Sequence, residues 1–327
     1  MSHAAPSGAT DVTTGPRSVA VDALRVAGVI AIVAGHNWGG REWVNPLLYT
    51  WHVPIFFVVT GYLWKAGRTT TFEIKRRAET LLVPYVVWIV IVTAIWFAVR
   101  HAIGWPITHD LVSDVLKGGW YAARPYSAYW FFTALFFACV FVRLTERVHV
   151  LLPFFVGLLG VMWATVDPAS VAHLWEGVGL AVPAVVFIVG GQMLRRYRGT
   201  VTRPLATGLV LAGPLFVLGA CGVFEPLNMK GAALGSPVAS VFMALGISLG
   251  GILIAEALEQ YLPTVARKAV LFVAQLSVPI LLLHTLVTQL LSVLGYPGTK
   301  WTFLVAYFVP FGIAAVLRAT PLRRFTL

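Results

Sequence analysis

Runs of about 20 apolar residues recur from one end of the 327-residue chain to the other. As a helix, a run of this length spans the hydrocarbon core of a bilayer. The composition agrees, since 58% of the residues are hydrophobic and 11% are charged, against roughly a quarter charged in a soluble domain. The sequence therefore predicts an all-α, polytopic transmembrane helical bundle. About ten spans are expected, at residues 20–38, 46–64, 80–100, 129–145, 149–166, 174–194, 204–223, 236–257, 269–293 and 300–318.

These spans leave no stretch long enough for a separate soluble domain. We expect one transmembrane domain at residues 18–320, with a disordered cytoplasmic tail at 1–17 and a short cytoplasmic tail at 321–327. The first tail is not expected to belong to a signal peptide. The span after it is interrupted by charge and is not followed by a small-residue cleavage site.

The net charge of +11 is carried by short loops between the apolar runs. No basic arm or recognition helix is present, so the charge predicts membrane orientation and contact with membrane lipid rather than a nucleic-acid partner. Most Lys and Arg residues fall in every second loop, which predicts a multi-pass protein of the cytoplasmic (inner) membrane with both termini cytoplasmic. The alternate loops, which contain fewer Lys and Arg residues, hold only Arg41, Arg100, Lys117, Arg124, Lys230 and Lys300.

The two cysteines, Cys139 and Cys221, each fall inside an apolar run. Both are expected to be buried free thiols, and neither a disulfide nor a metal framework is implied. No metal is therefore expected.

The first span, 21–38, carries two ionisable side chains on one face. Arg25 and His36 stand eleven positions apart, which places them within about 20° of each other around the helix and about 16 Å apart along it. Asp22, at i, i+3, can pair with Arg25. One interpretation is a snorkelling Arg with an interfacial His. The other makes His36 a general base or transient acceptor and Arg25 an anchor for an anion.

Two further candidate functional sites follow the first span in the sequence. His52 enters the second span from the side predicted for His36, where a structural role and a catalytic one are about equally plausible. The basic run Lys75, Arg76 and Arg77 is either a topology determinant that contacts anionic lipid or a binding site for the phosphates of a nucleotide-bearing donor.

Aromatic residues mark the predicted outer side of the membrane. Trp120 and Tyr121 lie in the long connection 101–128, and Trp130 opens the fourth span. They are either interfacial belt residues or a surface that stacks on sugar rings. His284, inside the ninth span, is a weak signal alone.

Short motifs occur in order along nearly the whole chain. They are Asp22-Ala23-Leu24-Arg25 with His36 after ten residues, His52-Val53-Pro54-Ile55-Phe56-Phe57 leading to Thr60-Gly61-Tyr62, Leu82-Val83-Pro84-Tyr85 after the basic run, Trp130-Phe131, and the late His284. In these motifs the sequence resembles the acyltransferase-3 family of bacterial integral membrane acyltransferases, which modify cell-surface glycans and lipids. Thr60 replaces the usual Ser. Leu replaces a Tyr before His284, which weakens any role for that histidine.

The resemblance implies transfer of an acyl group, commonly acetyl, from cytoplasmic acyl-coenzyme A to a hydroxyl of an envelope glycan or glycolipid. The co-substrate would then be bound by Arg25, Lys75, Arg76 and Arg77. His36 would be the base or a transient acyl carrier. Thr60, Tyr62 and the backbone near Gly61 are candidate oxyanion donors. The candidate carboxylate partners of His36 are Glu42, Asp110 and Asp114.

A transporter or flippase for an anionic lipid or glycan is the alternative function, with Arg25 and His36 lining its path. The sequence does not determine the acceptor, the acyl chain length or the oligomeric state.

Overall fold

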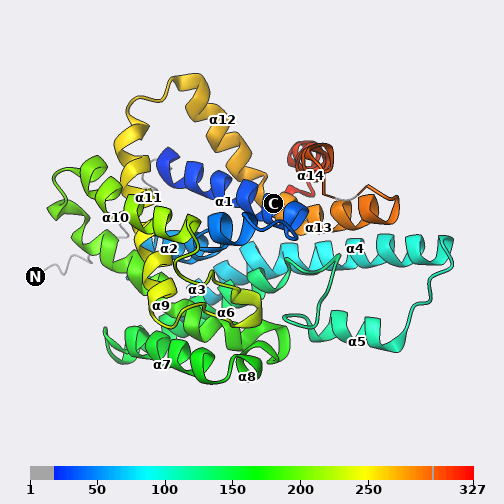
Figure 1. Ribbon diagram of the computed structural model, residues 1–327, viewed down its shortest axis with the longest axis horizontal. Helices are drawn as coiled ribbons and strands as arrows, with labels where there is room; N and C mark the ends of the chain where they lie inside the picture. Colours follow the sequence, from blue (N-terminus) through cyan, green and yellow to red (C-terminus); the bar gives the residue numbers. More distant parts are fainter. Residues whose placement is uncertain (1–17, 297) are drawn as a thin grey trace, which may run out of the picture.

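The computed structural model describes residues 18–296 and 298–327, which form a helical protein (Figure 1). The predicted tail at 1–17 lies outside the described residues. The α-helices are α1 (Val19–Trp38), α2 (Pro54–Tyr62), α3 (Thr70–Arg77), α4 (Val83–Ala102), α5 (His109–Lys117), α6 (Trp130–Val148), α7 (Leu152–Val166), α8 (Pro168–Ala172), α9 (Val178–Tyr197), α10 (Pro204–Ala220), α11 (Ala239–Glu259), α12 (Thr264–Gln275), α13 (Ser277–Val293), α14 (Lys300–Arg318) and α15 (Arg323–Thr326).

Short π- and 3₁₀-helical turns connect or extend several of these helices. They are η1 (Asn45–Tyr49), η2 (Ala78–Leu82), η3 (Trp175–Gly177), η4 (Arg198–Thr200) and η5 (Met229–Gly231). No strand forms within the described ranges. Asn228 and Ala233 in these ranges form an isolated antiparallel β-bridge. The predicted all-α class is confirmed.

Each predicted span overlaps one or two helices of the structure. Among the described residues, five helices are long and apolar enough to cross a membrane: Val19–Trp38, Thr70–Ala102, Trp175–Thr200, Ala239–Glu259 and Lys300–Arg318. The pair α12 and α13, bent by 60°, makes up to six, and α7 and α10 are shorter apolar helices. The chain is therefore a membrane protein with several spans, while the count of ten and the orientation stay predictions.

The second predicted span is broken rather than continuous. Residues 45–49 form η1, a turn follows, and α2 begins at Pro54. Pro54 has no backbone N–H, so it fits the first turn of a new helix better than the middle of a long one. The break leaves His52 between the two helical pieces.

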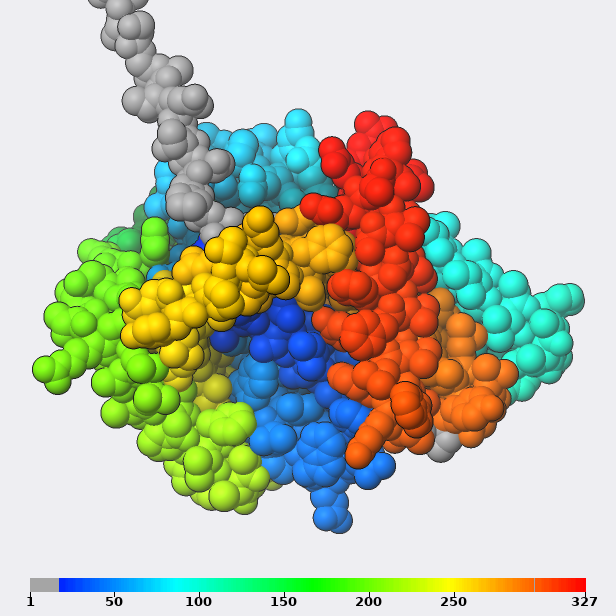
Figure 2. Space-filling view, turned by 90° about the horizontal axis from the view of Figure 1, so that it is seen from above, coloured from blue at the N-terminus to red at the C-terminus, as the bar shows by residue number. Residues whose placement is uncertain are grey.

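The first helix lies at the centre of the fold. It contacts α11, α12, α13 and α14, and Figure 2 shows it between the yellow α12 and the red α14. Its start is capped by Ser18, whose hydroxyl accepts from the Val21 backbone N–H at 3.4 Å. Because α1 is enclosed by late helices, residues from the two ends of the chain share one site.

Glycines allow α2 and α9 to pack closely. A Cβ at Gly61 would lie 1.8 Å from the Ile188 carbonyl oxygen, and one at Gly191 would lie 2.0 Å from that of Val58. Small residues at such crossings let backbones approach within a membrane bundle. This contact fixes the helix that follows His52.

The last residues are packed onto the bundle. Segment 321–327, predicted as a tail, contains α15, which contacts α4. The Trp88 indole N–H donates to the Thr326 carbonyl at 3.1 Å, and Thr326 is buried. The segment therefore contributes to a folded surface.

Candidate active site

Two histidines from distant parts of the chain meet at the centre of the site. His36, in the last turn of α1, and His284, in the middle of α13, lie with His284 Nε2 3.1 Å from His36 Nδ1. Their ring centroids are 4.9 Å apart, and His284 is fully buried. The partner of His36 is thus another imidazole.

The hydrogen bonds assign the tautomers of this pair. His284 Nδ1 lies 3.0 Å from the Ile280 carbonyl oxygen, which can only accept, so this nitrogen carries the proton. Neutral His284 then accepts at Nε2, and His36 donates from Nδ1. The remaining nitrogen of His36, Nε2, is left with a free lone pair. With these two hydrogen bonds, His36 Nε2 can act as a base or a nucleophile.

The break before α2 holds the third histidine in the same way. His52 Nδ1 lies 2.7 Å from the Leu48 carbonyl oxygen in η1, and this bond leaves the other nitrogen unprotonated in the neutral ring. The His52 side chain is buried, and its ring packs on Tyr49 with centroids 4.6 Å apart.

His36 and His52 line one cavity of about 130 Å³, called the histidine cavity below. This volume holds a small group or one edge of a larger molecule. No Asp or Glu belongs to its lining, which consists of Ile32, His36, Tyr49, His52, Val53, Ser127, Ala128, Trp130, Phe131, Leu227, Asn228, Met229, Lys230 and Leu281.

Loop residues supply the polar wall of the histidine cavity. Lys230, in η5, donates from Nζ to the Ala122 carbonyl oxygen at 2.6 Å, and burial lowers its pKa to about 8. The Ser127 hydroxyl is buried and has no hydrogen-bond partner among the described residues. Arg124 donates to the His36 carbonyl oxygen at 2.5 Å.

A second and larger cavity, of about 630 Å³, carries guanidinium groups and is called the arginine cavity below. Arg25 faces it and pairs with Asp22 at 3.2 Å, as predicted. Its lining also has no Asp or Glu. It comprises Arg25, Phe56, Thr60, Arg76, Arg77, Thr80, Leu81, Phe131, Phe132, Leu135, Ala274, Gln275, Ser277, Val278, Leu281, Arg318, Arg323 and Leu327.

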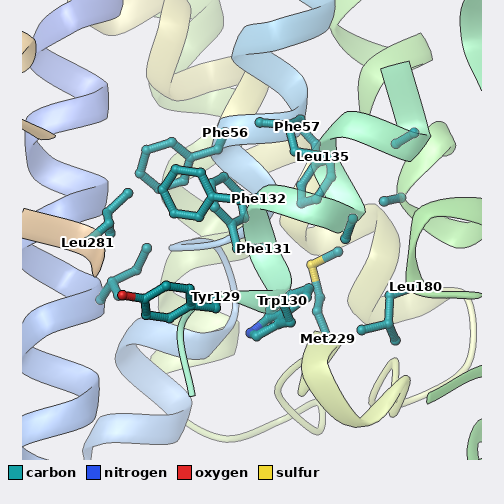
Figure 3. Packing of buried hydrophobic residues seen from close by; sticks show 14 of the residues in the cluster. Phe56, Phe57, Tyr129, Trp130, Phe131, Phe132, Leu135, Leu180, Met229 and Leu281 are labelled. Carbon is teal, nitrogen blue, oxygen red and sulfur yellow. The ribbon is translucent and has the colours of Figure 1, made fainter. Parts of the chain in front are cut away.

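Two apolar side chains belong to the walls of both cavities. Phe131, at the start of α6, and Leu281, in α13, line the histidine cavity and the arginine cavity alike. Phe131 packs edge-on against Phe56 and Phe57, with centroids 5.3 and 5.6 Å apart. Figure 3 shows Leu281 to the left of Phe56, Phe131 and Phe132, and Trp130 below Phe131. A thin apolar partition therefore separates the two cavities.

The structure brings some of the predicted site residues together. His36, His52 and Trp130 share the histidine cavity, and Arg25, Arg76 and Arg77 share the arginine cavity.

Other predicted residues lie elsewhere. Lys75 is exposed and lines neither cavity. Trp120 and Tyr121 pack against His173, with centroids 6.1 and 5.4 Å apart, outside both linings. Their predicted roles stay untested.

The expected oxyanion donors are not near His36. Thr60 faces the arginine cavity, the Tyr62 hydroxyl donates to Glu256, and Gly61 is packed against α9. This prediction was wrong because Thr60, Gly61 and Tyr62 follow His52 down α2, at ~1.5 Å per residue, and so are carried away from the cavity.

The predicted carboxylate partner of His36 is also absent at hydrogen-bonding range in the part of the chain described. Glu42 and Asp110 are exposed, and no bond joins either of them or Asp114 to His36. His284 occupies that place. The expectation that a missing Tyr weakens the role of His284 is not supported by the geometry.

Sequence reasoning missed His284 as a partner, together with the loop residues Ser127, Asn228 and Lys230. A lone His in an apolar run of α13 was a signal, but its distance of 248 positions from His36 hid the contact. The loop residues carried no pattern at all. Both cysteines are free, as predicted, but Cys221 is exposed rather than buried.

The fold and the site define a polytopic membrane protein with an imidazole pair at the smaller of two adjacent cavities. Residues 18–319 match a family model described as an acyltransferase domain, which covers most of the chain. The protein therefore belongs to the acyltransferase-3 family and is an acyltransferase, as its motifs predict. No curated protein and no solved structure matched in the corresponding searches.

Proposed function

We propose that the protein moves an acyl group, acetyl in the simplest case, from acyl-coenzyme A to a hydroxyl of an envelope glycan or glycolipid. The protein would act in the inner membrane, with the coenzyme on the cytoplasmic side. One observation carries the proposal: a cavity rich in arginine meets, at Phe131 and Leu281, a cavity lined by His36, whose partner is His284.

The arginine cavity suits the donor. Its lining carries five guanidinium groups and no Asp or Glu side chain, and Arg side chains bind phosphates through paired, charge-assisted hydrogen bonds. The loop charges predict a cytoplasmic location for this side, where the coenzyme is available. Arg25 would hold a phosphate or the thioester-bearing arm, with Asp22 fixing its position, and Arg76 and Arg77 would bind further phosphates.

The histidine cavity suits the reaction. His36 takes the proton of the acceptor hydroxyl at Nε2, and the hydroxyl oxygen bonds to the carbonyl carbon of the thioester. The carbon–sulfur bond breaks as the tetrahedral intermediate collapses, and His36 returns the proton to the leaving sulfur. His284 holds His36 in the required tautomer throughout.

The same lone pair supports a covalent route. His36 Nε2 would attack the thioester, the thiolate would leave, and the acceptor oxygen would then take the acyl group from the imidazole. His52, whose unprotonated nitrogen belongs to the same cavity, would supply the base for that second step.

The oxyanion of either route needs hydrogen-bond donors. The unpartnered Ser127 hydroxyl is one candidate. The Asn228 side chain is another, because its Oδ1 accepts from the Gly231 N–H at 3.3 Å, which leaves the amide NH₂ to donate.

The size of the histidine cavity favours acyl transfer over a flippase function. A volume of about 130 Å³ behind an apolar partition suits the passage of a small acyl group, not of a lipid headgroup or a glycan.

The test is the acyl content of envelope glycans and lipids, measured by mass spectrometry in cells carrying wild-type protein, His36→Ala or no protein. General-base catalysis is worth ~10²–10⁴ in rate, so His36→Ala should lose the acyl mass shift as fully as the null. His101→Ala, an exposed histidine at the end of α4, is the control.

Full acylation by His36→Ala at normal protein level would contradict the catalytic assignment. Unchanged masses with less exported material in the null would favour the flippase.

A further inference from the structure

The histidine cavity holds a cation that no carboxylate balances. Lys230 reaches it from the loop between α10 and α11, and its ammonium group donates to the Ala122 carbonyl. Over residues 18–296 and 298–327, no Asp or Glu oxygen lies within 4.0 Å of Lys230 Nζ. A carbonyl satisfies one of its three protons and leaves its charge uncompensated.

Local hydrogen bonds and buried neighbours fix the position of Lys230. Asn228 caps η5 by accepting from the Gly231 N–H, and its backbone pairs with Ala233. Met229 and Ala232, on either side of the turn, are buried. The 3₁₀ turn therefore holds Lys230 at the cavity, where burial lowers its pKa to about 8.

A second cation lies on the same side of His36. Arg124 donates to the His36 carbonyl oxygen, and within the described residues it forms no salt bridge. The histidines add no negative charge, and the cavity lining contains no Asp or Glu. The unpartnered Ser127 hydroxyl adds a free hydrogen-bonding group to the same wall. Together these groups suit an anionic ligand.

We propose that the acceptor carries a carboxylate or phosphate close to the hydroxyl that is acylated, and that Lys230 binds this anion. The inference rests on the proposed function, since it names the chemical class of the acceptor for that reaction. Arg124 assists from the rim, and His36 then faces the neighbouring hydroxyl. The resting charge of the cavity is balanced only when such an acceptor is bound.

The experiment compares methyl glucoside with methyl glucuronide, which differ by one carboxylate. Binding of each to the full-length protein in detergent is measured by titration calorimetry at pH 7. A charge-assisted bond predicts about 10- to 100-fold tighter binding of the glucuronide. Methyl glucoside 6-phosphate tests phosphate as the anion.

The variants separate recognition from chemistry. Lys230→Met should abolish the preference, and Lys230→Arg should keep most of it. Lys300→Met removes an exposed cation from the same predicted side, outside the histidine cavity, and should leave the preference intact. In turnover with acetyl-coenzyme A, Lys230→Met should raise KM for the glucuronide with little change in kcat.

Equal affinity for the two sugars, including no measurable binding of either, would overturn the inference. So would a preference that persists in Lys230→Met. An equal fall in kcat for both acceptors would place Lys230 at the oxyanion instead. None of these results touches the proposed acyl transfer, which stands or falls with His36→Ala.

Discussion

The two cavities differ in size, charge and the origin of their residues. The arginine cavity is nearly five times larger, about 630 against about 130 Å³, and carries its charge on five arginines. The histidine cavity carries imidazoles, one lysine and neutral polar groups. A permanently charged, roomy site suits binding of a polyanion, whereas a small site with tunable groups suits proton transfer. Under the proposed function, donor binding and chemistry are therefore separated along α1.

Removing the partner of His36 should have the largest effect on the histidine cavity. His284→Leu should lower kcat about 10- to 100-fold with little change in KM for acyl-coenzyme A, because His36 loses the bond that sets its tautomer. His284→Gln keeps a side-chain acceptor for His36 Nδ1–H and should retain more activity. Steady-state kinetics in proteoliposomes measures both.

A double variant checks that the two histidines act as one unit. His36→Ala combined with His284→Leu should be no slower than His36→Ala alone. Additive losses would mean that His284 acts on something else.

The arginine cavity predicts a difference between neighbours in one basic run. Arg76→Gln should raise KM for acyl-coenzyme A about ten-fold, because it removes a charge-assisted phosphate contact. Lys75→Gln is the matched control, since Lys75 lies one position away but outside the cavity, and should change KM less than two-fold. Equal effects would indicate general surface attraction, and raising the salt concentration would then reduce them together.

The histidine cavity should respond to pH through its lysine. A pKa of about 8 means that Lys230 is mostly charged at pH 7 and mostly neutral at pH 9, well below the range of an ordinary lysine. The dissociation constant for methyl glucuronide should therefore rise about five- to ten-fold between these pH values. Lys230→Arg, which stays charged, should flatten the curve, and binding of methyl glucoside supplies the baseline.

The partition predicts the smallest effect. Phe131→Ala should open a path for water between the cavities and raise hydrolysis of acyl-coenzyme A without acceptor about three-fold. Phe57→Ala, a buried phenylalanine that packs on Phe131 and lines neither cavity, has a similar packing cost of about 3–5 kcal/mol and should not raise hydrolysis. Free thiol released over time is the measurement, with thermal unfolding to compare stabilities.

Local sequence patterns predicted the helices and the contacts within one helix. The apolar runs predicted the apolar helices, and spacing alone placed Asp22 beside Arg25. The break before α2 was less visible, although Pro54 indicated it. These features depend on residues close together in the chain, and for that reason they could be predicted.

Contacts between distant segments could not be predicted in the same way. The His36–His284 bond depends on how α1 and α13 cross, which no spacing records. The prediction of a carboxylate beside His36 was wrong because another imidazole can accept from His36 Nδ1–H and fix the same tautomer. Lys230 was counted only as a loop charge, since the turn that carries it to the cavity is fixed by Asn228 and its backbone.

The imidazole pair has a consequence for how α13 enters the bilayer. An Asp or a Lys at the centre of a spanning helix costs about 2.5–3.5 kcal/mol during insertion by the translocon. A neutral histidine at position 284 supplies the orienting acceptor without bringing a fixed charge into the lipid. The helix can thus be inserted before it meets α1, and under the proposed function the imidazole pair carries a charge only during each turnover.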